Sequence, residues 1–176
     1  MAIGAALITV CSWITVPFIV PFTLQTFAVF TVVSLLGGRK GCLSILVYIL
    51  LGAVGLPVFS GFKGGVGVLV GTTGGYIIGF IFIALIYRFF EKIKGEGLPS
   101  LPFRIMSMVL GLIVCYAFGT AWFMVVYTHN TGAVDITTAL GWCVIPFIIP
   151  DLLKLALAML ISSRLAVAMR LNPMSL

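Results

Sequence analysis

Two residues of opposite charge lie three positions apart in the last apolar stretch, which reads Ile-Ile-Pro-Asp-Leu-Leu-Lys from position 148 to position 154. Residues at this spacing share one face of a helix, so Asp151 and Lys154 could present an acceptor and a donor together. A charge within the hydrocarbon of a membrane costs about 2.5–3.5 kcal/mol on insertion scales, and such residues usually face a cavity and a partner. We therefore predict a ligand site. The alternative is a packing element in which the two charges only neutralise each other.

A second set of polar side chains lies at the start of another apolar stretch. Thr23, Gln25 and Thr26 offer hydrogen-bonding groups there. These groups could bind a ligand, or Thr23 could simply cap the helix that follows. The sequence alone leaves both interpretations open.

Small residues form two stripes in apolar segments. Glycine recurs every four residues in the run Gly-Thr-Thr-Gly-Gly-Tyr-Ile-Ile-Gly over 71–79. This stripe predicts close packing of a neighbouring helix or close approach of the backbone to a ligand. Ala2 and Ala6 form a similar face near the N-terminus. That face predicts either generic helix packing or a docking surface for another membrane subunit.

The sequence lacks the residue patterns of most enzyme active sites. His129 is the one histidine, and neither a carboxylate pair nor an HExxH run accompanies it. No Gly-Lys-Ser or Gly-Lys-Thr sequence indicates a nucleotide-binding loop. The cysteines lack metal-ligand spacing and lie in or beside apolar runs, at positions Cys11, Cys42, Cys115 and Cys143. We predict a protein that is not an enzyme and that holds neither a cofactor nor a metal.

The composition decides the class of protein that positions these residues. Hydrophobic residues make up 62% of the 176 positions and charged residues only 8%, whereas a soluble domain carries about 25% charged residues. The surrounding solvent must therefore be lipid, in which backbone groups need internal partners. Long uncharged runs such as Leu43–Leu56 and Leu69–Tyr87 favour helices over a barrel of short alternating strands. The net charge of +6 reflects basic flanks of apolar segments, so no nucleic-acid partner is expected.

We predict an all-α, polytopic membrane protein, a bundle of six transmembrane helices that forms a single domain over 1–176. The expected segments are about 2–17, 23–37, 41–56, 69–90, 102–126 and 140–168. Glycine, proline and charge mark the breaks between them. The breaks include a tight polar turn over 37–41, a glycine-rich stretch over 57–67, a hydrophilic loop over 91–100 and a polar loop over 127–135.

Basic residues predict how this bundle lies in the membrane. With six crossings both termini lie on one side, and basic residues gather on the cytoplasmic side. If the termini are cytoplasmic, only Lys63 falls outside, and Lys154 lies within the membrane. The basic residues then inside are Arg39, Lys40, Arg88, Lys92, Lys94, Arg104, Arg164 and Arg170. We predict a multi-pass protein of the cytoplasmic membrane with both termini inside, and this topology puts Asp151 in the outward half.

Four stretches together resemble the BioY family, the biotin-specific substrate-binding (S) components of energy-coupling-factor (ECF) transporters. They are Val16-Pro17 continuing into Val-Pro-Phe-Thr-Leu-Gln-Thr-Phe-Ala-Val over 20–29; Leu-Pro-Val-Phe over 56–59 with Gly61 and Gly64-Gly65-Val-Gly67; Gly-Thr-Thr-Gly-Gly-Tyr-Ile-Ile-Gly-Phe over 71–80; and Pro150-Asp151-Leu-Leu-Lys154. The resemblance covers nearly the whole chain in order and spacing. One departure is Thr72, which stands where the family pattern has proline.

The resemblance implies an outward-facing biotin pocket in which Asp151 and Lys154 bind the ligand. It also implies that the face of Ala2 and Ala6 docks on a transmembrane coupling subunit driven by two cytoplasmic ATPase subunits. Biotin combines a ureido bicycle, an apolar tail and a carboxylate, so aromatic walls and close backbone approach are expected. The candidates are Gln25, with Phe22, Phe59, Tyr76 and Trp142 as walls and Gly64, Gly65 and Gly75 for the backbone. An intramembrane enzyme and a subunit for another small vitamin are the alternatives.

Overall fold

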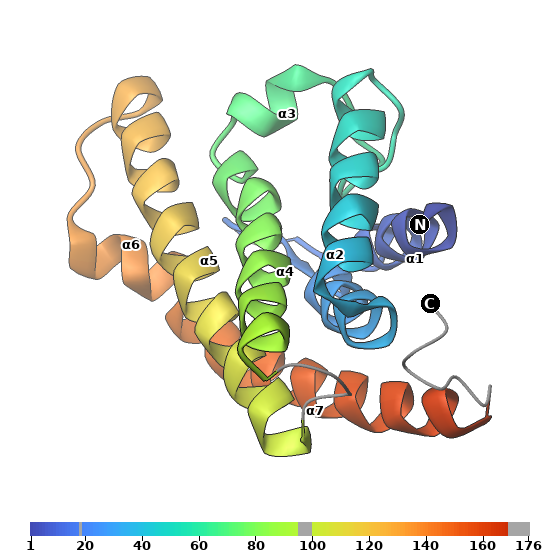
Figure 1. The fold of residues 1–176 in the computed structure, drawn as a ribbon. Helices are drawn as coiled ribbons and strands as arrows, with labels where there is room; N and C mark the ends of the chain where they lie inside the picture. The colour runs from blue at the N-terminus through green and yellow to red at the C-terminus, as the bar shows by residue number, and fades with distance from the viewer. Residues whose placement is uncertain (18, 95–99, 169–176) are drawn as a thin grey trace.

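The computed structural model describes residues 1–17, 19–94 and 100–168, and this part of the chain is a helical bundle with one short hairpin. Figure 1 shows α4 and α5 side by side, with α3 joining the end of α2 to the start of α4. The helices are α1 (Ala2–Trp13), α2 (Gln25–Ala53), α3 (Val66–Val70), α4 (Gly74–Lys94), α5 (Leu101–Asn130), α6 (Ile136–Cys143) and α7 (Ile145–Ala168). Strands β1 (Thr15–Val16) and β2 (Phe22–Thr23) pair antiparallel. The predicted all-α class is confirmed.

The outer surface of the bundle is suited to lipid. Within the described residues, α2, α5 and the continuous stretch Ile136–Leu165 are long and apolar enough to cross a membrane, and α1 is a shorter apolar helix. Large hydrophobic side chains point away from the bundle, among them Ile3 (86% exposed) and Leu153 (62% exposed). Lipid tails can solvate such a surface, and the backbone amides are satisfied within the helices. The chain is a helical membrane protein, as its composition predicts.

The polar turn that the sequence predicts over 37–41 is confined to Gly37. Only Gly37 leaves the helical conformation, with φ 78° and ψ 165°, and α2 continues on both sides of this kink. A left-handed φ of this kind is strained for any residue with a side chain, so glycine suits the position. Across the kink, the Glu91 carboxylate accepts a hydrogen bond of 2.9 Å from the Gly38 N–H. A side chain from α4 thus caps the second half of α2.

The segment predicted over 69–90 is helical from Gly74 onward, but it is not a single helix. The chain forms the short α3, breaks at 71–73 and then starts α4 at Gly74. Within α4, a Cβ added at Gly75 would lie 2.4 Å from the Cβ of Trp122 on α5. One added at Gly79 would lie 2.7 Å from the Sγ of Cys115. The glycine stripe therefore lets α4 and α5 approach closely, and Gly71 lies outside the helix that carries it.

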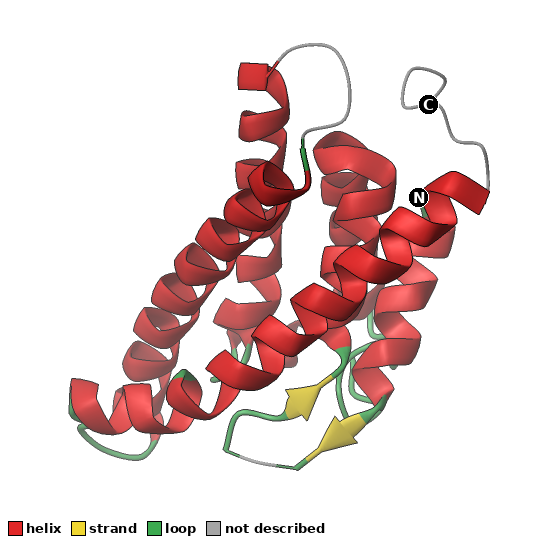
Figure 2. Cartoon of the chain, turned by 90° about the horizontal axis from the view of Figure 1, so that it is seen from below, coloured by secondary structure: helices red, strands yellow, loops and turns green. Residues whose placement is uncertain are grey.

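Three further boundaries differ from the sequence prediction. Helix α1 ends at Trp13 rather than near 17, because Thr15 pairs with Thr23 in the hairpin, which lies at the lower edge of the bundle in Figure 2. Helix α5 extends to Asn130, so the start of the loop predicted over 127–135 is helical. The segment predicted over 140–168 begins earlier and divides at Val144 into α6 and α7.

Arg104 does not lie in a solvent-exposed flank, although its position before an apolar stretch suggested one. Its side chain is buried, and its guanidinium Nη2 donates hydrogen bonds to the hydroxyls of Ser34 and Ser162. Ser34 Oγ in turn donates to Ser162 Oγ at 2.8 Å. This cluster ties α5 to α2 and α7. Arg170, another of the basic residues used to predict the membrane orientation, lies outside the described residues.

Candidate ligand site

A cavity of about 470 Å³ opens among α2, α4, α5 and α7. The hairpin strand β2 and the loop between α2 and α3 also contribute to its lining, through residues such as Thr23 and Ser60. Its wall is mainly apolar, with a few polar groups that converge from different helices, as is common in small-molecule sites. The apolar part comes from Phe59, Ile77, Phe80, Leu112 and Phe147.

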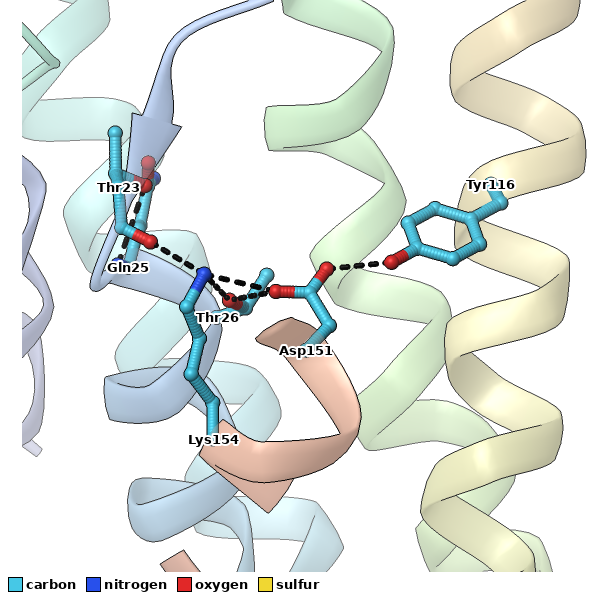
Figure 3. Close-up of polar contacts among 6 residues, drawn as sticks. All are labelled: Thr23, Gln25, Thr26, Tyr116, Asp151 and Lys154. Atoms are coloured by element: carbon cyan, nitrogen blue, oxygen red, sulfur yellow. Dashed lines mark hydrogen bonds and ion pairs between the residues drawn. The ribbon is translucent and has the colours of Figure 1, made fainter. Parts of the chain in front are cut away.

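Asp151 and Lys154 both line this cavity and form a buried ion pair. Figure 3 shows the contact between their side chains. The distance between Lys154 Nζ and Asp151 Oδ1 is 2.8 Å, and the two residues are only 6% and 2% exposed. Lys154 Nζ also donates to the carbonyl oxygen of Thr23 at 2.7 Å and to the hydroxyl of Thr26 at 3.2 Å. It lies 4.0 Å from the centre of the Phe22 ring. These partners compensate for removing the ammonium group from water.

The Asp151 carboxylate is held from two other helices. Thr26 on α2 donates to Oδ1 at 2.9 Å, and Tyr116 on α5 donates to Oδ2 at 2.5 Å (Figure 3). A carboxylate has about four acceptor positions, two on each oxygen. Lys154 and Thr26 occupy those of Oδ1, and Tyr116 occupies one of those of Oδ2. Asp151 thus keeps an acceptor position on Oδ2 for an N–H donor in the cavity.

Three other predicted residues line the same cavity: Gln25, Tyr76 and Phe59. Gln25 Nε2 donates to the Tyr48 hydroxyl at 2.7 Å, which leaves the Gln25 carbonyl oxygen without a hydrogen-bond donor among the described residues. The Tyr76 hydroxyl bonds to the Thr120 hydroxyl at 2.9 Å. Phe59 packs edge-on against Tyr48 with ring centres 5.5 Å apart. The structure brings these side chains together with the ion pair, although their positions span most of the chain.

The predicted glycines lie outside the lining of the cavity. Gly75 packs on Trp122, as described above. A Cβ at Gly64 would lie 2.3 Å from the carbonyl oxygen of Leu56, so that glycine allows a close approach of backbone to backbone. Gly65 has a φ of 95° and its N–H donates to the Gly52 carbonyl oxygen at 2.7 Å. The contacts around these three glycines therefore indicate roles in loop and helix packing.

Two predicted aromatic walls and the predicted docking face lie elsewhere. Phe22 is outside the cavity lining and contacts the site through Lys154 and through Phe147, whose ring it stacks on with centres 5.8 Å apart. Trp142 packs edge-on against Tyr127 at 5.9 Å. Ala2 and Ala6 are exposed on the outer face of α1. Between them in the chain, Gly4 is buried, and a Cβ there would lie 2.7 Å from Ser44 Oγ.

Sequence reasoning missed Tyr116 and Lys63 as site residues. Tyr116 lies in the middle of an apolar helix, where a tyrosine is a weak signal because its ring is readily buried. Lys63 had a clearer signal, since it is the one basic residue that the predicted topology places outside the membrane. Both residues line the cavity.

Comparison with known proteins identifies the family. A model of the BioY family matches residues 1–171. The chain belongs to the BioY family. The protein named Biotin transporter BioY from Thermotoga maritima is 44% identical over 164 residues, which cover 93% of this chain and 91% of that protein. Biotin transporter BioY2 from Lactococcus lactis subsp. cremoris is 36% identical over 88% of this chain and 81% of that protein.

A solved structure agrees with this family assignment. The crystal structure of the S-component for biotin from an ECF-type ABC transporter matches this BioY chain with a TM-score of 0.80 and 27% identity. The match covers 93% of this chain and 87% of that one. The resemblance inferred from the four sequence motifs is thereby confirmed.

Proposed function

We propose that this BioY protein captures biotin and mediates its uptake as the substrate-binding subunit of an ECF-type transporter. The observation that carries the proposal is the buried Asp151–Lys154 pair, set in a cavity of about 470 Å³ in a member of this family. That volume lies within the range of about 300–1,000 Å³ typical of small-molecule sites. The relatives named above support biotin as the ligand.

The chemistry of the cavity suits the ureido head of biotin. A urea group presents N–H donors and one carbonyl acceptor on a flat apolar frame. The acceptor position left on Asp151 Oδ2 and the carbonyl oxygen of Gln25 can receive N–H donors. The apolar side chains around Phe59 and Phe147 then cover the rings. Binding of this kind needs neither a metal nor a cofactor.

We also propose a membrane topology in which a single domain over 1–176 crosses the membrane six times. The crossings are α1, the two halves of α2 on either side of Gly37, α4, α5, and α6 with α7. Both termini then lie in the cytoplasm, and loops 17–22, 57–68 and 127–139 lie outside. The presence of Thr23, Ser60 and Lys63 in the cavity lining supports an opening toward the outer side.

Uptake against a gradient needs an energy source, which the proposal assigns to partner subunits. In this scheme a transmembrane coupling subunit, linked to two cytoplasmic ATPase subunits, docks on the exposed face of Ala2 and Ala6. The small side chains of that face permit close contact between helices in lipid. The chain itself acts as the binding subunit and not as an enzyme.

Titration of purified protein in detergent with biotin tests the ligand and the site together. Wild type should bind biotin saturably, whereas Asp151→Asn and Lys154→Ala should bind at least about 100-fold more weakly, since each leaves a buried partner unpaired. Asp135→Asn is the matched control, because Asp135 is exposed and caps α6 away from the cavity. Equal affinity in all four proteins would contradict the site. Saturable binding of a different vitamin, without binding of biotin, would contradict the ligand.

A further inference from the structure

The cavity carries one more positive charge than negative charge. Among the described residues that line it, the charged side chains are Lys63, Asp151 and Lys154. Asp151 and Lys154 neutralise each other at 2.8 Å. Lys63 has no carboxylate partner in the part of the chain that the structure describes. A cavity with this balance favours a ligand that carries a single negative charge.

The two lysines differ in how far they are available to a ligand. An ammonium group has three N–H donors, and those of Lys154 reach Thr23, Thr26 and Asp151. Lys154 is also 6% exposed, and so lies at the buried end of the cavity. Lys63 is exposed and lies on the loop at the open end. Its ammonium donors are therefore available where Lys154 has none left.

The loop that carries Lys63 is fastened to the end of α1. Ser12 Oγ donates to the carbonyl oxygen of Val58 at 2.6 Å. The indole Nε1 of Trp13 donates to the carbonyl oxygen of Pro57 at 2.9 Å. These bonds link segments about 45 positions apart, and they hold the base of the loop against the bundle. The backbone of Lys63 is thus kept near the cavity.

The turn directly before Lys63 is also constrained. Gly61 has a φ of 72° and Phe62 a φ of 56°, which is unusual for a residue with a side chain. The ring of Phe62 stacks on Trp13 with centres 4.9 Å apart. The N–H of Phe59 donates to the carbonyl oxygen of Lys63 at 2.9 Å and closes the turn. A strained turn that packing holds in place is a common device at ligand sites.

We propose that Lys63 binds the carboxylate end of the ligand, while Asp151, held in place by Lys154, binds its neutral polar head at the buried end. The inference rests on the proposed function and extends it, because it orients the ligand and makes Lys63 a specificity-determining residue. The site then selects an apolar molecule with a hydrogen-bonding head and a monoanionic tail. It discriminates against the same molecule with an uncharged tail.

The test compares biotin with biotinamide, which replaces the carboxylate by an uncharged amide. Both are titrated by calorimetry into wild type, Lys63→Gln and Lys63→Arg in detergent at low salt. Wild type should bind biotin up to about fivefold more tightly than biotinamide, the upper end of what an exposed charge pair provides. Lys63→Gln should weaken biotin alone and bring this ratio near one, and Lys63→Arg should restore it. Added salt should reduce the ratio in wild type. The control variant Lys92→Gln removes an exposed charge outside the cavity and should keep the wild-type ratio of biotin to biotinamide affinity.

Each outcome decides the inference. A Lys63→Gln protein that keeps the preference for biotin, or that loses both ligands equally, overturns the role of Lys63 and leaves the proposed function standing. Loss of the preference in Lys154→Gln, with biotinamide still bound, reverses the orientation and also overturns it. A wild type that binds neither compound saturably contradicts both the proposed function and this inference.

Discussion

Tyr116 on α5 donates a hydrogen bond of 2.5 Å to Asp151 on α7, and this bond joins two helices that otherwise border an apolar groove. The groove has a volume of about 650 Å³ and includes Ile113 from α5 and Ile148 from α7. Tyr116 lines both the groove and the ligand cavity. The hydroxyl therefore orients Asp151 while its ring forms part of the wall between the two spaces.

Replacing Tyr116 with phenylalanine should weaken biotin binding about tenfold, because a hydrogen bond to a charged group contributes about 1.5–3 kcal/mol. The carboxylate of Asp151 would lose the donor that fixes Oδ2. Calorimetric titration measures the effect. Tyr127→Phe is the control, since Tyr127 stacks on Phe123 outside the cavity. Unchanged affinity in Tyr116→Phe would show that this bond does not position Asp151 for the ligand.

Exchanging the two charges, Asp151→Lys combined with Lys154→Asp, separates a ligand site from a packing element. If the residues only neutralised each other, the exchanged protein would keep both its stability and its function. The structure predicts loss of biotin binding and a lower melting temperature, because the hydroxyls of Thr26 and Tyr116 donate to a carboxylate at position 151. Each single exchange should destabilise the protein further, by about 3–5 kcal/mol, since it leaves like charges buried together. Thermal melting in detergent and titration measure these effects.

Replacing Arg104 with leucine should lower the melting temperature by several degrees, because α5 loses charge-assisted hydrogen bonds to Ser34 and Ser162 worth about 1.5–3 kcal/mol each. The melting temperature of Arg104→Lys should lie between those of wild type and Arg104→Leu, since an ammonium keeps the charge without the planar fork of donors. At temperatures below the unfolding transition, the biotin affinity of these variants should change by less than about threefold, because Arg104 is outside the cavity. Arg164→Leu, at an exposed position of α7, is the control. A melting temperature equal to wild type would contradict the structural role of the cluster.

Gly75→Ala tests whether the glycine stripe serves packing. The added methyl would meet Trp122, so we expect overpacking that costs about 1–3 kcal/mol and a lower melting temperature. At Gly141 in α6 nothing lies within 4 Å of an added Cβ, so Gly141→Ala should be neutral or slightly stabilising through helix propensity. A Gly75→Ala protein that melts like wild type but binds biotin weakly would favour the ligand interpretation of this glycine.

The sequence by itself determined the class of protein and the most informative pair of residues. Composition requires a lipid environment, and lipid leaves helices as the structure for long uncharged runs. Asp151 and Lys154 share a face because of local helix geometry, which depends only on their spacing. The glycine stripe around Gly75 likewise indicated a close approach, either of a neighbouring helix or of a ligand.

The tertiary structure decided which residues face one cavity and where the helices break. Tyr116 meets Asp151 across two helices, and Lys63 reaches the cavity from a loop fastened to α1. Such contacts depend on how helices pack, which no local pattern encodes. The break at Gly37 is a single residue, because α4 supplies Glu91 to cap the helix that follows. Arg104 is buried for a similar reason, since Ser34 and Ser162 from other helices provide its partners.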